Sequence, residues 1–146
     1  MKTLRRETAA ELPDIGFGTY KLGQETEECV LEALRAGYRL IDTAQIYGNE
    51  KAVCLALKRS GLPRASVFVT SKVWRTKHGY HRTRDACLQS LKELGTDYID
   101  LMLVHWPDAK RGWPLKTGDM SPPDFTPEMR LDTWRALEDL HTEGKL

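Results

Sequence analysis

The feature that most constrains the fold is an alternation of short apolar strands with amphipathic helices, which repeats four times along the 146 residues. Apolar side chains at helical spacing mark the helices, and short runs of β-forming residues mark the strands. The expected strands are 15–19, 38–41, 67–70 and 99–104, and the expected helices are 25–35, 49–60, 83–94 and about 128–141. This alternation is typical of an α/β fold with a parallel sheet and right-handed crossovers.

Glycines mark the ends of the expected helices, because Gly37, Gly61 and Gly95 each come directly or closely after a helical pattern. The last strand contains the unbroken apolar run 101–104, which predicts burial on both faces of the strand. In the last helix, the side chains expected to face inward are Leu131, Trp134, Leu137 and Leu140. A long loop at 107–127, rich in glycine and proline, lies between this strand and this helix, and loops of this length are often functional.

A barrel is favoured over a doubly wound sheet, because no G-x-G-x-x-G motif comes after any expected strand. The segment 16–18 supplies only two glycines, and Thr19-Tyr20-Lys21 comes next. A complete eight-stranded barrel needs about 250 residues. We therefore expect residues 1–146 to form a single, incomplete domain that corresponds to the first four βα units of a (β/α)8 TIM barrel.

Composition excludes several other classes of protein. The formal net charge is +1, from 22 basic and 21 acidic residues, which gives no electrostatic reason to bind nucleic acid or an anionic membrane. No apolar run approaches the roughly 20 residues that a membrane-spanning helix needs, and the first residues are too polar for a secretory signal. The cysteines Cys29, Cys54 and Cys87 are expected to be reduced, so we expect a cytoplasmic protein.

Ionisable side chains stand where three of the expected strands end. Asp42 comes after the second strand, Lys72 after the third and His105 after the fourth, while Tyr47 lies on the loop after the second. Each of the three lies an even number of positions after an apolar strand residue, so they should face the same side of the sheet. Active sites of such barrels lie at the carboxyl ends of the strands. We expect these four side chains to share one mouth.

The chemistry of this group favours proton donation to a carbonyl oxygen. A phenol has a pKa of about 10 in water, and a neighbouring ammonium group lowers that value. A carboxylate offsets the cost of keeping the ammonium partly dry, and an imidazole orients a carbonyl by hydrogen bonding. The group contains no metal set and no strong nucleophile, so the carbonyl carbon must receive a hydride from elsewhere, and a nicotinamide cofactor would supply it.

Each of these residues alone has a simpler interpretation. An Asp–Lys pair is usually a salt bridge, and a histidine at a strand end or a tyrosine in a loop is usually structural. Only their joint arrangement on successive strand ends favours catalysis.

Several segments together resemble the aldo-keto reductase family, in its order and spacing and over essentially the whole chain. The segments are Gly37-Tyr38-Arg39-Leu40-Ile41-Asp42-Thr43-Ala44, Tyr47-Gly48-Asn49-Glu50, Thr70-Ser71-Lys72-Val73-Trp74, Asp97-Tyr98-Ile99-Asp100-Leu101, His105-Trp106-Pro107 and Gly16-Phe17-Gly18-Thr19. The resemblance implies a (β/α)8 barrel of aldo-keto reductase type and NADPH-dependent reduction of aldehydes or ketones, which are small-molecule carbonyl substrates.

The resemblance also implies a role for each matching residue. Tyr47 is the expected proton donor, tuned by Lys72 with Asp42, and His105 orients the substrate carbonyl. The positions that line the nicotinamide end of the cofactor are Gly18, Thr19, Tyr20 and Asp42. The positions of the substrate pocket are Tyr20, Trp74, His105, Trp106 and Trp113, although core or loop packing is the alternative for the tryptophans.

Two departures from the family pattern stand out. Cys54 replaces the glycine that usually closes the hallmark, and the chain stops at Leu146, where the family begins a fifth strand. The family's second half carries most contacts to the pyrophosphate and adenosine phosphate. We therefore expect the isolated chain to bind NADPH weakly and to aggregate, self-associate or require the missing half. The competing hypothesis is a non-catalytic half-barrel scaffold or regulatory subunit, whereas a nucleic-acid or membrane module has no supporting feature.

Overall fold

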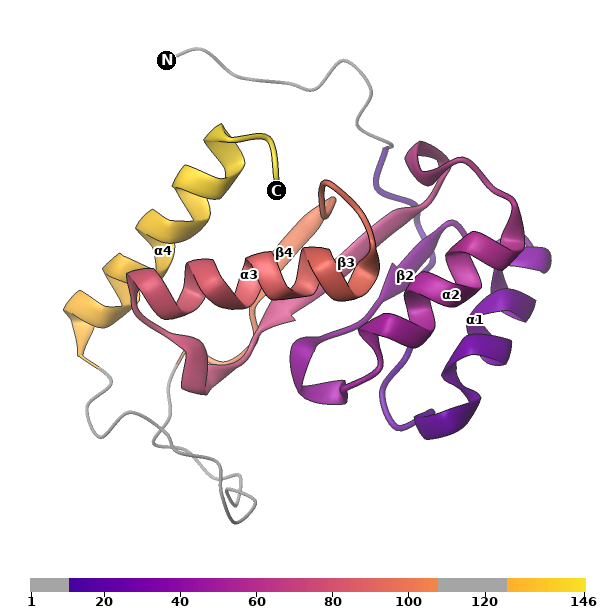
Figure 1. The fold of residues 1–146 in the computed structure, drawn as a ribbon, viewed down its shortest axis with the longest axis horizontal. Helices are drawn as coiled ribbons and strands as arrows, with labels where there is room; N and C mark the ends of the chain where they lie inside the picture. Colours follow the sequence, from indigo (N-terminus) through magenta and orange to yellow (C-terminus); the bar gives the residue numbers. More distant parts are fainter. Residues whose placement is uncertain (1–10, 108–125) are drawn as a thin grey trace.

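Four parallel strands in the order β1-β2-β3-β4 form the centre of the computed structural model, which describes residues 11–107 and 126–146. The strands are β1 (Phe17–Gly18), β2 (Leu40–Asp42), β3 (Phe68–Val73) and β4 (Leu101–Val104). A helix comes after each strand: α1 (Thr26–Arg35), α2 (Glu50–Ser60), α3 (Tyr80–Leu94) and α4 (Pro127–Thr142). Consecutive helices pack side by side along one face of the sheet (Figure 1). The four predicted βα units and their parallel order are confirmed.

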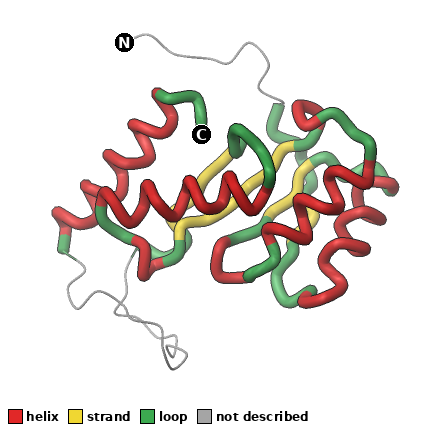
Figure 2. Tube along the Cα trace, in the orientation of Figure 1, coloured by secondary structure: helices red, strands yellow, loops and turns green. Residues whose placement is uncertain are grey.

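The core lies between the sheet and this layer of helices (Figure 2). Ile41, Val69 and Met102 come from three neighbouring strands and are buried. The helices contribute their apolar stripes to the same cluster, and the fully or nearly fully buried members are Val30, Leu31, Leu34, Val53, Leu94 and Leu140. Burial of these stripes is the main favourable term that holds the helices on the sheet.

Two element boundaries differ from the sequence-based expectation in a way that matters for the site. Strand β3 continues to Val73, because residues 71–73 pair with β4 after the pairing with β2 has ended at Thr70. Lys72 therefore lies inside a strand. Helix α3 begins at Tyr80, three residues earlier than predicted, after Gly79 turns the chain with a φ of 97°. Short 3-10 turns that the pattern did not predict stand at Gly23–Glu25, Gln45–Tyr47, Arg64–Ser66 and Arg75–Lys77.

Part of the predicted burial in α4 and β4 is wrong. Leu131 and Trp134 are more than half exposed, because α4 turns a different face toward α3 and the sheet. The buried side chains of that face are Thr133, Ala136, Leu137 and Leu140. In β4, Leu101 and Leu103 are also exposed, since no described element packs over the side of the sheet opposite the helices. Met102 points toward the helices and is buried, as predicted.

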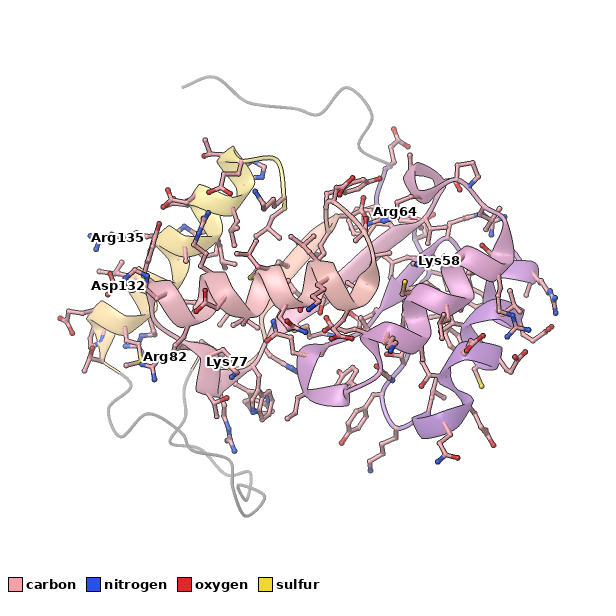
Figure 3. The ribbon with its side chains drawn as sticks, viewed as in Figure 1. Lys58, Arg64, Lys77, Arg82, Asp132 and Arg135 are labelled. Carbon is pink, nitrogen blue, oxygen red and sulfur yellow. The ribbon has the colours of Figure 1, made fainter. Side chains whose placement is uncertain are left out.

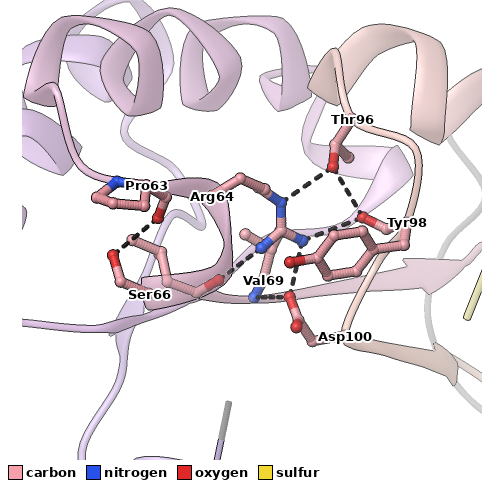
Figure 4. Close-up of polar contacts among 8 residues, drawn as sticks. Pro63, Arg64, Ser66, Val69, Thr96, Tyr98 and Asp100 are labelled. Atoms are coloured by element: carbon pink, nitrogen blue, oxygen red, sulfur yellow. Dashed lines mark hydrogen bonds and ion pairs between the residues drawn. The ribbon is translucent and has the colours of Figure 1, made fainter. Parts of the chain in front are cut away.

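Arg64 links the amino ends of β3 and β4, at the end of the sheet opposite the predicted site (Figure 4). Its guanidinium donates to the carbonyls of Val67 and Tyr98, at 2.6 and 3.0 Å, and pairs with Asp100 at 2.7 Å. The Asp100 carboxylate also accepts from the backbone N–H of Val69 at 2.8 Å. Because these charged groups are matched by hydrogen-bond partners, the partly buried pair fixes how the two strands enter the sheet.

The three cysteines are free, and Cys54 and Cys87 are buried. Among the helices that the structure describes, none has the length and apolar character needed to cross a bilayer.

Candidate active site at the carboxyl ends of the strands

Asp42 and Lys72 form a partly buried ion pair near the carboxyl ends of β2 and β3. The Nζ atom of Lys72 lies 2.5 Å from Oδ1 of Asp42 and donates to the carbonyl of Thr43 at 2.8 Å. In the ladder, Asp42 pairs with Thr70, so the side chain of Lys72 reaches back across the strands to the carboxylate. The Lys72 side chain is only 12% exposed, which removes much of the screening that weakens surface ion pairs.

Tyr47 lies beside this pair because the chain after β2 makes a tight turn. A 3-10 turn spans Gln45–Tyr47, and Gly48 comes next in the left-handed region with a φ of 67°, a conformation that favours glycine. The turn places the centre of the Tyr47 ring 5.1 Å from Nζ of Lys72. The centre of the Tyr20 ring lies 5.0 Å from that of Tyr47. A phenol and an ammonium group from separate strand ends thus meet in one place.

His105 completes the group from the end of β4. Its backbone N–H donates to the carbonyl of Val73 at 3.1 Å, and its ring lies 5.8 Å from the ring of Tyr47 and 5.2 Å from that of Trp74. Burial lowers the pKa of His105, and the positive charge of Lys72 lowers it further, while Asp42 acts in the opposite direction. The imidazole is therefore neutral at neutral pH and carries one N–H that can donate to a carbonyl oxygen.

The structure brings the four predicted residues into one mouth. A fixed positive charge stands beside the phenol, and a neutral imidazole lies against the same phenol ring. Groups held in this way stabilise negative charge as it develops on an oxygen, without reorganising during a reaction. The arrangement is suited to general-acid chemistry on a carbonyl.

The other predicted site positions differ in how exposed they are and in whether they border the mouth. Gly18 ends β1 beside Asp42, and a side chain built there would meet no heavy atom within 4 Å. Thr19 is fully buried, so its hydroxyl faces the interior rather than the mouth, whereas Tyr20 is exposed. Trp74 is half-buried beside His105, and Trp106 is exposed. Trp113 lies outside the described residues, as does most of the loop at 107–127.

A layer of buried and partly buried polar side chains under the mouth escaped sequence reasoning. Gln45 accepts from the backbone N–H of Trp74 at 3.1 Å and donates to Ser90 at 3.0 Å. The carboxyl of Glu50 accepts from Ser71 at 2.6 Å, and burial raises the pKa of Glu50. The sequence offers one signal for these side chains, which is that Gln45 and Glu50 come shortly after the end of a strand. Polar residues at such positions are also common on the surface, so residue type alone does not predict that they are buried.

A pocket of about 550 Å³ lies between α2 and α3, apart from the four predicted residues. Its charged lining includes Lys77 and Arg82, which stand near the start of α3 (Figure 3). Acidic side chains, Asp85 and Glu93 among them, share the lining, so it has no single charge preference. Within residues 11–107 and 126–146, no group of histidine, cysteine and acidic residues is arranged to hold a metal ion.

Comparison with known proteins decides the family. A model of the Aldo/keto reductase family matches residues 14–146. The chain belongs to this family. Solved aldo-keto reductase structures match its sheet and helices, so the four βα units correspond to about the first half of the (β/α)8 barrel.

Relatives with named activities are close in sequence. Glyoxal reductase of Bacillus subtilis is 40% identical over 146 residues, covering 99% of this chain and 46% of that relative. Glycerol 2-dehydrogenase (NADP(+)) of Saccharomyces cerevisiae is 42% identical, covering 99% of this chain and 49% of that relative. The Bombyx mori aldo-keto reductase solved in complex with NADP has a TM-score of 0.78 and 34% identity, covering 92% of this chain and 44% of that one. The chain thus spans less than half the length of these aldo-keto reductases.

Proposed function

We propose that this chain carries the proton-donating half of an NADPH-dependent reductase that converts aldehyde or ketone carbonyls to alcohols. The observation that supports it best is the position of the Tyr47 ring, 5.1 Å from the ammonium of Lys72 and 5.8 Å from the His105 ring. The names of two relatives, glyoxal reductase and glycerol 2-dehydrogenase (NADP(+)), point to the same class of functional group.

The residues at the mouth fit the nicotinamide end of NADPH. The open space at Gly18 lets a flat group approach the backbone closely. The exposed ring of Tyr20 and the partly exposed carboxylate of Asp42 border the same opening and offer an aromatic surface and a hydrogen-bond acceptor. The substrate carbonyl would then lie between Tyr47 and His105, with Trp74 and Trp106 as apolar walls.

Each residue at the mouth would have its own task. The Nε2–H of His105 donates to the carbonyl oxygen and fixes its direction, because Nδ1 of the same ring is buried. The hydroxyl of Tyr47 gives its proton to the same oxygen, and the nearby ammonium of Lys72 stabilises the negative charge left on the phenol oxygen. Asp42 holds that ammonium in place. NADPH, when bound, supplies the hydride to the carbonyl carbon.

The proposed protein partner is the other half of a barrel, supplied by further chain or by a second copy. Leu101 and Leu103 expose apolar surface on the side of β4 that faces away from the helices. Strand β4 has a described neighbour, β3, along one edge only, so its other edge is open to another strand. Sedimentation of a clean monomer that stays soluble at high concentration would contradict this part of the proposal.

The test is NADPH oxidation with glyoxal and with 4-nitrobenzaldehyde. The chain is assayed alone and after mixing with the C-terminal half of the Bacillus subtilis relative. Tyr47→Phe should lower turnover by about 100-fold or more, whereas the control Tyr38→Phe, at a partly exposed position beside Phe17, should leave it unchanged. Turnover that is unchanged in Tyr47→Phe would contradict the mechanism. Absence of turnover in both preparations would favour the non-catalytic half-barrel scaffold.

A further inference from the structure

A closed cluster of buried polar side chains lies where three loops meet beneath the mouth. Its members are Thr19, Thr26, Thr43 and Asn49, of which the three threonines are fully buried and Asn49 is 6% exposed. They come from the end of β1, the start of α1, the end of β2 and the start of α2. Buried polar groups of this density are stable only when every donor and acceptor has a partner.

The hydrogen bonds in the cluster run in one direction. The Thr19 hydroxyl donates to the Thr43 hydroxyl at 2.9 Å, which donates to Oδ1 of Asn49 at 2.9 Å. The Nδ2 group of Asn49 then donates to the carbonyl of Thr19 at 2.9 Å and to the Thr26 hydroxyl at 3.1 Å. The Thr26 hydroxyl donates to the carbonyl of Gly23 at 2.8 Å. Each hydroxyl hydrogen has one main acceptor, so the orientation of the Asn49 amide is fixed.

No other small side chain satisfies this arrangement. It needs an acceptor toward Thr43 and two donated hydrogens toward Thr19 and Thr26. An aspartate of the same shape supplies only acceptors, and an alanine supplies nothing. Loss of the amide would leave the carbonyl of Thr19 buried without its donor. The unsatisfied carbonyl would destabilise the loop that carries Tyr20.

The cluster is joined to the site on three sides. The carbonyl of Thr43 accepts from Nζ of Lys72 at 2.8 Å. Thr19 directly precedes Tyr20, whose ring lies 5.0 Å from that of Tyr47. Asn49 itself comes two residues after Tyr47, across the left-handed Gly48.

We propose that Asn49 is a positioning residue, whose amide holds the Tyr47 and Tyr20 rings together beside the ammonium of Lys72. It acts through Thr19 and Thr43 and touches neither substrate nor cofactor. The catalytic part of this inference rests on the proposed function. The hydrogen bonds that position the two rings can be tested in a chain that shows no turnover.

The test reports on the surroundings of the two rings. The chain is labelled with 3-fluorotyrosine, and the fluorine signals are assigned with Tyr20→Phe and Tyr47→Phe. In Asn49→Asp, the signals at Tyr20 and Tyr47 should shift, while that of Tyr80, at the start of α3, should not. The matched control is Thr133→Ala, which removes a buried hydroxyl that bonds Gly79 at 2.9 Å between α3 and α4, and it should leave Tyr20 and Tyr47 unshifted.

If Asn49→Asp does not fold, Thr43→Val decides the question, because it keeps the shape of the side chain and removes only its hydrogen bonds. A folded variant of either kind with unshifted Tyr20 and Tyr47 signals overturns the proposal. In a preparation that turns over, kcat should fall about tenfold or more, with KM nearly unchanged, since misplacement of a reacting group acts on the chemical step. Shifted signals without turnover in the wild-type chain would support the positioning role and count against the reductase proposal alone.

Discussion

The ammonium nitrogen of Lys72 lies 5.1 Å from the centre of the Tyr47 ring while it is bonded to the carboxylate of Asp42 at 2.5 Å. Asp42 therefore fixes the ammonium group of Lys72 at a position close to the Tyr47 ring. In the proposed reaction, the charge of Lys72 would be most useful to the phenol after the proton has left, when an oxyanion remains. Asp42 matters because a lysine side chain with four carbons would otherwise have many rotamers.

Removal of that charge should affect turnover far more than the fold. Lys72→Met keeps most of the apolar stem, so we expect a folded protein that loses about 100-fold or more in kcat of carbonyl reduction. Unfolding free energy should fall by about 1–3 kcal/mol, since Asp42 loses a charged hydrogen-bond donor. Steady-state kinetics and urea unfolding measure both. Lys51→Met, at an exposed position on α2, is the matched control, and equal activity of the two variants would contradict the assigned role.

Stability should depend strongly on Arg64, which is far from the predicted mouth. Arg64→Met leaves the Asp100 carboxylate, whose side chain is only 7% exposed, without its cation. We expect a loss of about 3 kcal/mol of unfolding free energy. Arg64→Lys should recover only part of it, because an ammonium group cannot serve Val67, Tyr98 and Asp100 as the guanidinium fork does.

A surface pair provides the comparison for Arg64. Arg135 and Asp132 lie on α4 and are both largely exposed, with a 3.0 Å separation (Figure 3). Arg135→Met should change the unfolding free energy by less than about 0.5 kcal/mol. Urea titrations of the three variants at one salt concentration decide the matter. A similar small effect at Arg64 would show that its network does not hold β3 and β4 together.

The order of the elements could be predicted because its signals are local. Helical spacing, glycine stops and apolar runs each lie within about a dozen residues, and tertiary packing agreed with them. The placement of Asp42, Lys72 and His105 together required one more step, the rule that parallel strands present their carboxyl ends at one edge. That step depends on topology and on the alternation of side chains along a strand, and both follow from the sequence pattern.

What escaped prediction depends on contacts between distant segments. Asn49 and Thr26 are ordinary helix-start residues until the loop after β1 folds over them. Arg64 stands 36 residues before Asp100, and nothing nearby in sequence marks the pair. Periodicity locates an apolar stripe in α4 but not the side that meets α3, so it predicts the wrong face for Trp134.

His78 should make stability depend on acid pH. It is fully buried, and burial lowers its pKa to about 4, with the charges of Arg130 and Arg82 acting in the same direction. The unfolded chain has the ordinary histidine pKa of about 6.5 and binds the proton first. Stability from His78 is therefore fully present above about pH 6.5 and is lost as pH falls toward 4, with a loss of roughly 2 kcal/mol by pH 5.

The measurement is the urea unfolding free energy at pH 7.5 and pH 5. The buried carboxyl of Glu50, whose pKa is raised, contributes with the opposite sign, so wild type and variant are compared at each pH. His78→Gln should remove the His78 component of the slope, whereas His81→Gln, at an exposed position, should keep it. A slope that is unchanged in His78→Gln would show that other groups cause the acid sensitivity.

Cys54 and Gly95 should show a measurable coupling. Gly95 ends α3 with a φ of 61°, and a Cβ atom there would lie 2.7 Å from Sγ of Cys54. Gly95→Ala therefore suffers both the left-handed backbone cost of about 1–2 kcal/mol and a steric overlap. Cys54→Ala removes the sulfur, so the double variant should be more stable than the sum of the single effects predicts, by about 1 kcal/mol.

The matched control for this coupling is Gly61→Ala, because the φ of Gly61 is 68° but its Cβ would meet nothing within 4 Å. Gly61→Ala should combine additively with Cys54→Ala in thermal or urea unfolding. Additive behaviour of Gly95→Ala as well would mean that Cys54 moves aside without cost, and the contact between α2 and the end of α3 would then be looser than the structure implies.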